Sequence, residues 1–271
     1  MQNHSLQNIF ATGSTGTIGR YLPSEVQPLQ INLLKFHELN EIDLPENNTT
    51  LIHLAGIVGN INVTKDIEIS RKINIDGTLA LAGRISRLKN YKFVYVSTSH
   101  VYKNSQGKLS ELSPTEPISE YANQKLETET LLQNMIEPEN LTIVRVFSLL
   151  DWGMPENSLG GAAQKVLAGE KNFVINASDD VRDFLSPSQV AAVLYKIALH
   201  QSINGIFNLC SGHGIKVRDA IQILINEKKC EKLQSRLISG NSNVPSIVGD
   251  NSKILNQIPG LNLKWQPLRS A

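Results

Sequence analysis

Three glycines, each separated from the next by two residues, mark the start of the chain. The stretch reads Ile9-Phe10-Ala11-Thr12-Gly13-Ser14-Thr15-Gly16-Thr17-Ile18-Gly19, so a short apolar run leads directly into the glycines. Gly13 can take the positive φ of a tight turn, which a Cβ atom would disfavour. Gly16 leaves room for a pyrophosphate to approach the backbone, and Gly19 lets a following helix pack close to the strand. We therefore expect a strand, a turn and a helix whose N-terminus offers N–H groups and partial positive charge to phosphates.

This glycine pattern leaves two interpretations open. Its spacing is Gly-x-x-Gly-x-x-Gly, whereas the usual dinucleotide fingerprint is Gly-x-Gly-x-x-Gly. Glycine-rich turns between a strand and a helix also occur with no ligand. Residues elsewhere in the chain must decide between nucleotide binding and a purely structural turn.

Composition limits the class of protein. The chain has 271 residues, of which 41% are hydrophobic, enough for one large domain or slightly more. The net charge of +1 gives no electrostatic reason to expect binding to nucleic acid or to an acidic membrane surface. Cys210 and Cys230 are few and unpatterned, as in a reduced cytoplasmic protein, and we assign both to packing.

No targeting or membrane segment is expected. Residues 1–8 lack the basic and apolar regions of a signal peptide. No apolar run approaches the roughly 18 residues that span a bilayer. The sequence also shows no set of metal ligands. We expect a cytoplasmic protein without a membrane anchor or a metal site.

Short β-rich runs alternate with helical patterns, which is typical of βαβ units and a parallel sheet. Helical spacing of apolar residues predicts helices at Asp66–Leu88 and Glu120–Met135. The first helix is expected to be short, because Pro23 follows Gly19 closely. The sequence predicts an α/β fold with a doubly wound, Rossmann-like parallel sheet. The expected strands are Asn8–Thr12, Leu29–Leu34, Thr50–Ala55, Tyr91–Ser97 and Leu141–Phe147.

The pattern of the sequence changes after Phe147. Loops rich in Gly, Pro, Asn and Ser separate shorter elements, and no internal repeat is found. We expect residues 1–150 to form a dinucleotide-binding domain and residues 151–271 a smaller substrate-binding lobe, from which a strand and a helix can return to the first domain. The expected helices are Gly160–Ala168, Ser188–His200, Val217–Asn226 and Asp250–Leu255, and the expected strands are Phe173–Ile175 and Gly205–Leu209.

Tyr121 and Lys125 are four residues apart in the predicted helix, so they share one helical face. An ammonium near a phenol stabilises the phenolate and lowers the phenol pKa from about 10 toward neutrality. Tyr121 would then be a proton donor or acceptor at physiological pH. The alternative is an ordinary solvated pair of side chains.

Hydroxyl groups upstream favour the catalytic interpretation. The strand Phe93–Val96 runs into Ser97-Thr98-Ser99-His100-Val101-Tyr102. Side chains at the carboxyl end of a parallel strand lie where such sheets bind ligands. One of these hydroxyls could hydrogen-bond a substrate oxygen while its proton moves.

With these stretches in place, the chain resembles an extended short-chain dehydrogenase/reductase of the NAD-dependent epimerase/dehydratase family, which acts largely on nucleotide sugars. The similarity covers nearly the whole chain and keeps the family's order of motifs. The matching segments are residues 12–19, 51–56, 74–78 and 96–102, the pair Tyr121 and Lys125, and residues 144–147, 182–185, 208–212 and 250–253.

The resemblance implies roles for individual residues. Tyr121 would be the general acid/base, Thr98 would orient the substrate oxygen, and Lys125 would also bind the cofactor ribose. Asn74 would steady a water near Lys125; the alternative is an ordinary helix-surface residue. Arg182 would hold the substrate's diphosphate bidentately; the alternative is a salt bridge with one of its acidic neighbours, Asp179, Asp180 or Asp183.

The resemblance also implies two sets of ligand contacts. The expected cofactor contacts are Gly13, Thr15, Gly16, Thr17, Ile18, Gly19, Leu54, Ala55, Gly56, Tyr121, Lys125 and Phe147, with Asp43 and Leu44 at the adenine. Asp43 and Leu44 could equally be a loop residue and its apolar neighbour. The expected substrate contacts are Thr98, Ser99, His100, Ser148 and Arg182.

The sequence departs from the family pattern in three respects. The acid expected about 20 residues beyond Gly13, which grips the ribose 2′-hydroxyl, is missing. Lys35 or Arg20 could instead meet a 2′-phosphate, so NAD and NADP both remain open. Ser99 and His100 replace the Asp-Glu pair of sugar 4,6-dehydratases, so we expect no dehydratase activity. His100 could move a proton at a carbon beside a ketone, hydrogen-bond the sugar, or simply face solvent or cofactor. Ser148 stands where many relatives have Asn.

The sequence thus predicts an NAD(P)-dependent enzyme that interconverts alcohol and ketone on a nucleotide-activated sugar. A 4-keto reductase and an epimerase share every residue named so far. The alternative is a non-catalytic dinucleotide sensor or scaffold of the same fold, although such a protein would be free to lose Tyr121 or Lys125. We also expect a homodimer, in which helices 66–88 and 120–135 form a four-helix bundle with their symmetry mates.

Overall fold

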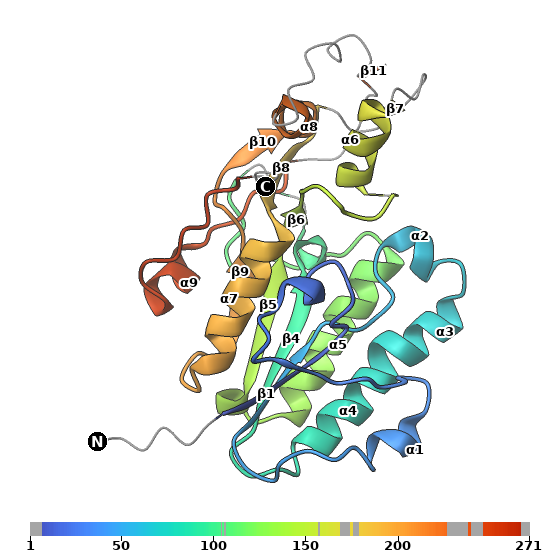
Figure 1. Cartoon of the computed structure of the whole chain (residues 1–271), viewed down its shortest axis with the longest axis vertical. Helices are drawn as coiled ribbons and strands as arrows, with labels where there is room; N and C mark the ends of the chain where they lie inside the picture. The colour runs from blue at the N-terminus through green and yellow to red at the C-terminus, as the bar shows by residue number, and fades with distance from the viewer. Residues whose placement is uncertain are drawn as a thin grey trace.

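Six parallel strands form the central sheet, in the order β2-β1-β3-β4-β5-β9 (Figure 1). The structure is a computed structural model that describes residues 7–103, 105, 107–156, 158–168, 174–175, 179–226, 238–239 and 246–266. The strands are β1 (Asn8–Thr12), β2 (Gln27–Pro28), β3 (Thr49–His53), β4 (Lys92–Thr98), β5 (Leu141–Val146) and β9 (Gly205–Leu209). The predicted Rossmann-like α/β fold is confirmed.

Helices cover both faces of this sheet (Figure 1). Alternate residues of a strand point to opposite faces, so Val94 and Val96 contact one helical layer while Phe93 and Tyr95 contact the other. The first layer is α7 (Pro187–Leu199), which Ser186 and Gln189 cap at its N-terminus, with α9 (Ser252–Gln257) beside it. The second layer contains α1 (Phe36–Leu39), α4 (Thr78–Ile85) and α5 (Glu120–Met135).

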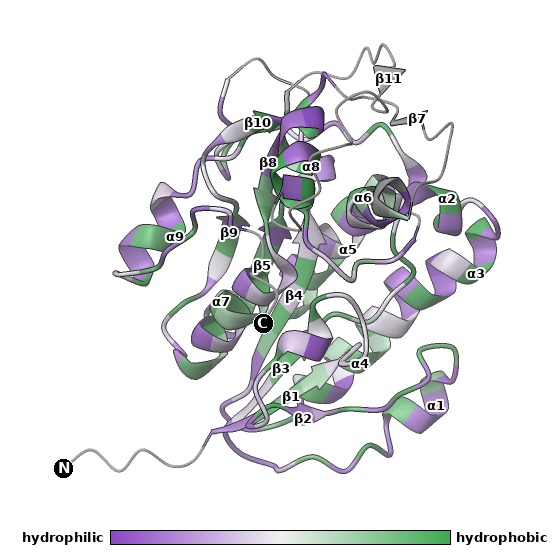
Figure 2. Cartoon of the chain, turned by 45° about the horizontal axis from the view of Figure 1, so that its top comes forward, coloured by the Kyte–Doolittle hydropathy of each residue, from purple (hydrophilic) through white to green (hydrophobic). Residues whose placement is uncertain are grey.

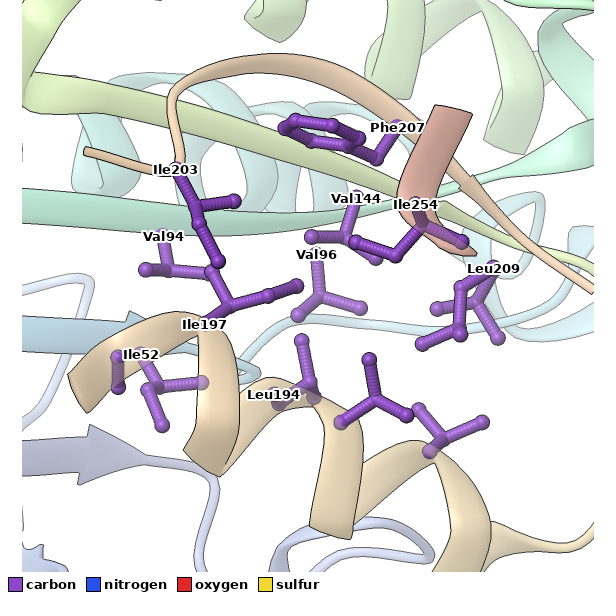
Figure 3. Packing of buried hydrophobic residues seen from close by; sticks show 14 of the residues in the cluster. Ile52, Val94, Val96, Val144, Leu194, Ile197, Ile203, Phe207, Leu209 and Ile254 are labelled. Carbon is purple, nitrogen blue, oxygen red and sulfur yellow. The ribbon is translucent and has the colours of Figure 1, made fainter. Parts of the chain in front are cut away.

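Apolar side chains meet tightly between α7 and the sheet. Figure 3 shows Leu194 and Ile197 of α7 beside Ile52, Val94 and Val96 from the strands. These residues are almost completely buried. Hydropathy follows the same division, because the central strands are mostly hydrophobic while the outer helices carry both kinds of residue (Figure 2).

Several expected elements differ from the structure. The predicted strand Leu29–Leu34 is wrong, since β2 is only Gln27–Pro28. Pro28 cannot donate to a further ladder, and Asn32 accepts from the N–H of Leu34 at 3.0 Å, which bends the chain. The predicted helix Asp66–Leu88 is interrupted. It consists of α3 (Ile67–Arg71), a π-helical segment from Lys72 to Gly77, and α4.

The first helix is even shorter than expected. A single 3₁₀ turn, Gly19–Tyr21, follows the glycine loop. A Cβ atom on Gly19 would collide with the carbonyl oxygen of Gly13. Gly19 therefore packs against its own loop, and its predicted role in bringing a helix close to the strand is wrong.

The later half of the chain builds a small lobe at one end of the sheet (Figure 1). Its strands are β6 (Ser148–Leu149), β8 (Val181–Leu185) and β10 (Gly214–Lys216), with β7 (Val174–Ile175) pairing with β11 (Ile238–Ser239). Its helices are α6 (Leu159–Leu167) and α8 (Val217–Asn226), and α2 (Asn60–Val63) lies nearby in the first half. Phe173, Cys230 and Pro267 lie outside the described residues.

The boundary near residue 150 stays a prediction, but β9 and α7 do return to the main sheet as the sequence allowed. The expected C-terminal helix is displaced to Ser252–Gln257. No helix in the described parts of the chain is long and apolar enough to cross a membrane.

One buried lysine joins the sheet to α7. Lys92 of β4 is fully buried, and its ammonium donates to the carbonyl oxygens of Ile197 at 3.0 Å, His200 at 2.5 Å and Ile203 at 2.7 Å. Carbonyls at the C-terminal end of a helix lack partners within the helix and carry partial negative charge. Lys92 supplies the donors and, although burial lowers its pKa to about 7, part of the charge as well.

We expect Lys92→Met to lower the free energy of unfolding by about 2–4 kcal/mol, because three carbonyls lose their charged donor while the side-chain volume is kept. Urea unfolding followed by circular dichroism measures the effect. The exposed Lys89→Met is the matched control and should unfold like the wild type. Equal midpoints for the two variants would contradict the assignment.

Candidate functional site

The glycine loop and the end of β3 enclose one side of a cavity of about 700 Å³. Gly13 has a φ of +67°, and a Cβ atom there would lie 2.8 Å from the amide nitrogen of Ala55. Only glycine fits this close contact between two backbones. Nine predicted cofactor contacts line the cavity: Gly13, Thr15, Gly16, Thr17, Ile18, Gly19, Leu54, Ala55 and Gly56.

Other segments complete this cavity, and sequence reasoning missed them. Residues 58–62, in and before α2, form one wall, and Leu149, Met154, Pro155 and Ser158 from the lobe form another. Their sequences carry no motif, so only the fold brings them to the glycine loop. A backbone-lined cradle that a Cβ atom would fill fits a dinucleotide diphosphate, and glycines stand where that cradle needs them.

A short chain of hydrogen bonds fixes the loop behind the cavity. The hydroxyl of Thr12 accepts from the N–H groups of Leu54 and Ala55 at 3.2 and 3.1 Å, so its own proton goes to Nδ1 of His53 at 2.8 Å. Nε2 of His53 then donates to the hydroxyl of Thr78 at 2.9 Å. This pattern fixes a neutral imidazole, and burial followed by the charge of Lys125 lowers the pKa of His53 to about 3.

Asn74 holds the segment after β3 in place. Its Oδ1 accepts from the N–H of Ile57 at 2.7 Å, and its Nδ2 donates to the carbonyl of Ile57 at 3.0 Å and to Oε1 of Gln124 at 2.9 Å. The residue is buried in the π-helical segment, so it is no ordinary surface residue. Its expected role at a water near Lys125 stays a prediction.

Thr98 and Tyr121 meet at the carboxyl end of β4. Thr98 is buried, its hydroxyl accepts from the N–H of His100 at 3.2 Å, and it hydrogen-bonds the Tyr121 phenol. Tyr121 stands in the first turn of α5, which Ser119 caps by accepting from the N–H of Ala122 at 3.2 Å. The structure therefore brings the two predicted catalytic hydroxyls together.

Lys125 lies deeper, on the next turn of α5. Its ammonium donates to the carbonyl of Val96 at 2.9 Å and lies 4.6 Å from the centre of the Tyr95 ring. Burial lowers the pKa of Lys125 to about 8, although the negative charge of Glu129 opposes the shift. The lysine is thus close to losing its proton at physiological pH.

The expected lowering of the Tyr121 pKa is wrong for the protein alone. Burial raises this pKa to about 12, and the hydrogen bond with Thr98 offsets only part of the increase. The charge of Lys125 is used on the Val96 carbonyl and the Tyr95 ring. Tyr121 is consequently protonated at neutral pH and is set to donate a proton.

A buried ion pair lies one turn further along α5 than Lys125. The sequence analysis did not identify this pair. Arg145 of β5 donates from Nη2 to Oε2 of Glu129 at 2.6 Å, with the two side chains 5% and 1% exposed. The guanidinium lies 4.7 Å from the centre of the Tyr102 ring, and the Tyr102 hydroxyl donates to Asn208 at 2.6 Å. Glu129 follows Lys125 by one helical turn, which was the only available sequence signal.

The predicted substrate residues gather near Thr98, but not all are free. Part of the His100 side chain is exposed to solvent. The protein atoms around its ring desolvate the charged form and lower the pKa of His100, and the positive charge of Arg182 lowers it further. Arg182 donates from Nη2 to Oδ2 of Asp180 at 2.6 Å, with its side chain 12% exposed. The alternative of a salt bridge is therefore present in the structure. Ser99 is buried, and Ser148 of β6 is half-buried.

Five predicted cofactor contacts do not line the cavity: Asp43, Leu44, Tyr121, Lys125 and Phe147. Leu44 is buried in the core below α4, and Asp43 is exposed beside it. Phe147 packs against Tyr102 and Cys210 in a separate apolar cluster. Their contact with a cofactor stays a prediction.

The neutral His53 makes stability depend on pH. The folded pKa of about 3 lies below the ordinary 6.5, so the unfolded chain binds the proton first as the pH falls. The contribution of His53 to the free energy of unfolding is fully present above about pH 6.5. It decreases below that pH and is lower by roughly 2 kcal/mol at pH 5. Urea unfolding at pH 7 and pH 5 should show this loss in the wild type and not in His53→Gln.

The exposed His37→Gln is the control for this comparison and should keep the wild-type pH dependence. If His53→Gln loses as much stability between pH 7 and pH 5 as the wild type does, His53 is not buried in the neutral form.

The chain is similar to known proteins and to a solved structure. The sequence is 26% identical over 217 residues to the GDP-6-deoxy-D-talose 4-dehydrogenase of Aggregatibacter actinomycetemcomitans, covering 79% of this chain and 68% of that protein. It is 27% identical over 249 residues to the GDP-6-deoxy-D-mannose reductase of Pseudomonas aeruginosa, covering 83% and 81%. The solved structure of RMD from Pseudomonas aeruginosa, complexed with NADPH, superposes with a TM-score of 0.80 at 22% identity over 96% of this chain and 94% of that one.

A family comparison covers most of the chain. Residues 9–210 match the NAD dependent epimerase/dehydratase family, a span that contains the glycine loop, Thr98, Tyr121 and Lys125. The cofactor is accordingly NAD or NADP, and NADPH is bound in the similar solved structure. This protein belongs to the NAD dependent epimerase/dehydratase family.

Proposed function

We propose that the protein is an NADP(H)-dependent reductase that converts the C4 ketone of a GDP-linked 6-deoxyhexose to an alcohol. The observation that carries this proposal is the protonated Tyr121 beside Thr98, because reduction of a ketone requires a proton donor at the carbonyl oxygen. Two relatives support the substrate class, since both are named for chemistry at GDP-6-deoxyhexoses.

The chain's own residues would handle the substrate oxygen. The bound dinucleotide would supply the hydride. Thr98 would hydrogen-bond the carbonyl oxygen and align it with the Tyr121 phenol, which gives up its proton as the alcohol forms. Lys125 would stabilise the resulting phenolate, and its pKa of about 8 allows it to pass on a proton from solvent. Burial of the group excludes water that would weaken these interactions.

An epimerase is the second enzymatic candidate, and it uses the same residues. It must begin by removing a proton from an alcohol, so Tyr121 would first have to lose its own proton, and cofactor stoichiometry distinguishes the two candidates. A sensor or scaffold would have no need to bury Thr98 and Lys125 beside Tyr121. Absence of dehydratase activity stays a prediction based on Ser99 and His100.

Cofactor stoichiometry tests the proposal. The purified protein is mixed with NADPH and GDP-4-keto-6-deoxymannose, and absorbance of the reduced nicotinamide is followed together with product by chromatography. We expect one NADPH consumed for each alcohol formed. Conversion of a GDP-hexose to its C4 epimer without net NADPH use would identify an epimerase, and no turnover of either sugar would contradict both enzymatic candidates.

Tyr121→Phe should lower turnover by about 10²–10⁴, the usual contribution of a general acid/base group. Cofactor affinity, measured by fluorescence titration, should stay near the wild-type value. Tyr195→Phe, in α7 on the other face of the sheet, is the matched control for loss of a phenolic hydroxyl. Wild-type turnover in Tyr121→Phe would show that the proton comes from another group.

Arg182→Ala should raise KM for the nucleotide sugar by roughly tenfold, because a charge-assisted contact contributes about 1.5–3 kcal/mol and Asp180 already shares the guanidinium. NADPH affinity should not change. Arg182→Lys should recover part of the loss, since an ammonium lacks the planar fork.

Removing Arg182 alone leaves the buried carboxylate of Asp180 without this partner, which costs stability. The double variant Asp180→Ala with Arg182→Ala separates folding from binding. If the double variant is stable and binds GDP as tightly as the wild type, Arg182 is not the substrate clamp.

The homodimer also stays a proposal. Ile67 and Ile69 of α3 and Ile118 before α5 are exposed apolar residues on the face where the second chain is expected. Their exposure supports a contact there, since scattered single apolar residues are common but neighbouring ones suggest an interface.

A further inference from the structure

The diphosphate site of this protein lacks the helix that normally completes it. In the dinucleotide fold, the helix after the glycine loop directs free N–H groups and about half a positive charge at the diphosphate. Here the chain makes one 3₁₀ turn, Gly19–Tyr21, and is extended again at Leu22 (Figure 1). A single turn aligns too few peptide dipoles to provide that charge.

Arg20 stands inside this turn. Its guanidinium donates from Nη2 to the carbonyl of Gly153 at 2.6 Å and lies 5.1 Å from the centre of the Tyr21 ring. Among the described residues no carboxylate forms an ion pair with it. Its positive charge is therefore not neutralised within the part of the protein that the structure describes.

The hydrogen bond between Arg20 and Gly153 joins two segments of the chain, and each segment contributes to one wall of the cofactor cavity. Gly19, which precedes Arg20, lines the cavity on the glycine-loop side. Met154, which follows Gly153, lines it on the lobe side. The guanidinium thus joins the two chain segments that form these walls, next to the lining residues Gly19 and Met154, and only one of its five N–H groups is used on Gly153.

We propose that Arg20 replaces the missing helix: it supplies the positive charge for the dinucleotide's diphosphate and links the lobe to the glycine loop over it. The guanidinium can keep its bond to Gly153 and direct its remaining N–H groups at phosphate oxygens, for which its planar fork is suited. The inference depends on cofactor binding by this family and not on the reaction proposed above.

The other nearby cation is already engaged. Lys35, which the sequence analysis also considered, forms an ion pair with Glu38 at 2.6 Å, whereas Arg20 has no such partner among the described residues. A 2′-phosphate of NADP is a different target for Arg20, and it gives a different result in the experiment below.

The test is a set of fluorescence or calorimetric titrations of the purified protein with NADPH and with NADH. Both cofactors carry the diphosphate, but only NADPH carries the 2′-phosphate. Arg20→Ala should raise the Kd of both by a similar factor of roughly ten to a hundred, the value of a lost charge-assisted contact. Arg20→Lys should recover part of the affinity. Arg20→Gln, which keeps a donor for Gly153 without the charge, should not.

Arg218→Ala is the matched control, because it removes one positive charge from α8, where Arg218 pairs with Asp179. It should bind both cofactors as the wild type does. Circular dichroism and thermal unfolding without cofactor establish that each variant is folded. A loss confined to NADPH would assign Arg20 to the 2′-phosphate, and unchanged Kd values for both cofactors would remove it from the site; either result overturns the proposal.

Discussion

The contact between the glycine loop and the end of β3 is the constraint on which the site depends. Two backbones approach so closely at Gly13 and Ala55 that no side chain fits between them. The hydroxyl of Thr12 is bonded to Leu54 and Ala55, and the neutral ring of His53 continues the connection to α4. The glycine loop and the end of β3 both line the cavity, so this contact sets one side of it.

The position of helix α5 depends on a second set of buried contacts. α5 carries Tyr121, Lys125 and Glu129 on successive turns, and Glu129 is held by Arg145 of β5. The stack continues through Tyr102 to Asn208 of β9. One line of polar contacts therefore runs from Glu129 of α5 to the edge strand β9, so the helix that carries Tyr121 is held by strands of the sheet.

Much of the fold was accessible from the sequence because its causes are local. Apolar runs located β1, β3, β4, β5 and β9, since strands buried on both faces must be apolar throughout. The edge strand β2 was placed wrongly. An edge strand does not need a continuous apolar sequence, and Pro28 and Asn32 end this one early. The spacing of Tyr121 and Lys125 indicated a shared helical face. The pKa of Tyr121 could not be obtained that way, because it depends on burial by segments distant in sequence.

The late return of β9 has a consequence for how the chain is made. β5 ends at Val146, and its neighbour β9 begins only at Gly205, after β6, α6, β7, β8 and α7 have been synthesised. Until both β9 and α7 have emerged from the ribosome, the edge of β5 is unpaired. The face of the sheet that α7 covers in the folded protein is then also bare. Exposed strand edges with apolar surfaces are sites of intermolecular pairing. Translation of this protein therefore passes through a stage at which the ribosome-bound chain is open to aggregation and to capture by chaperones.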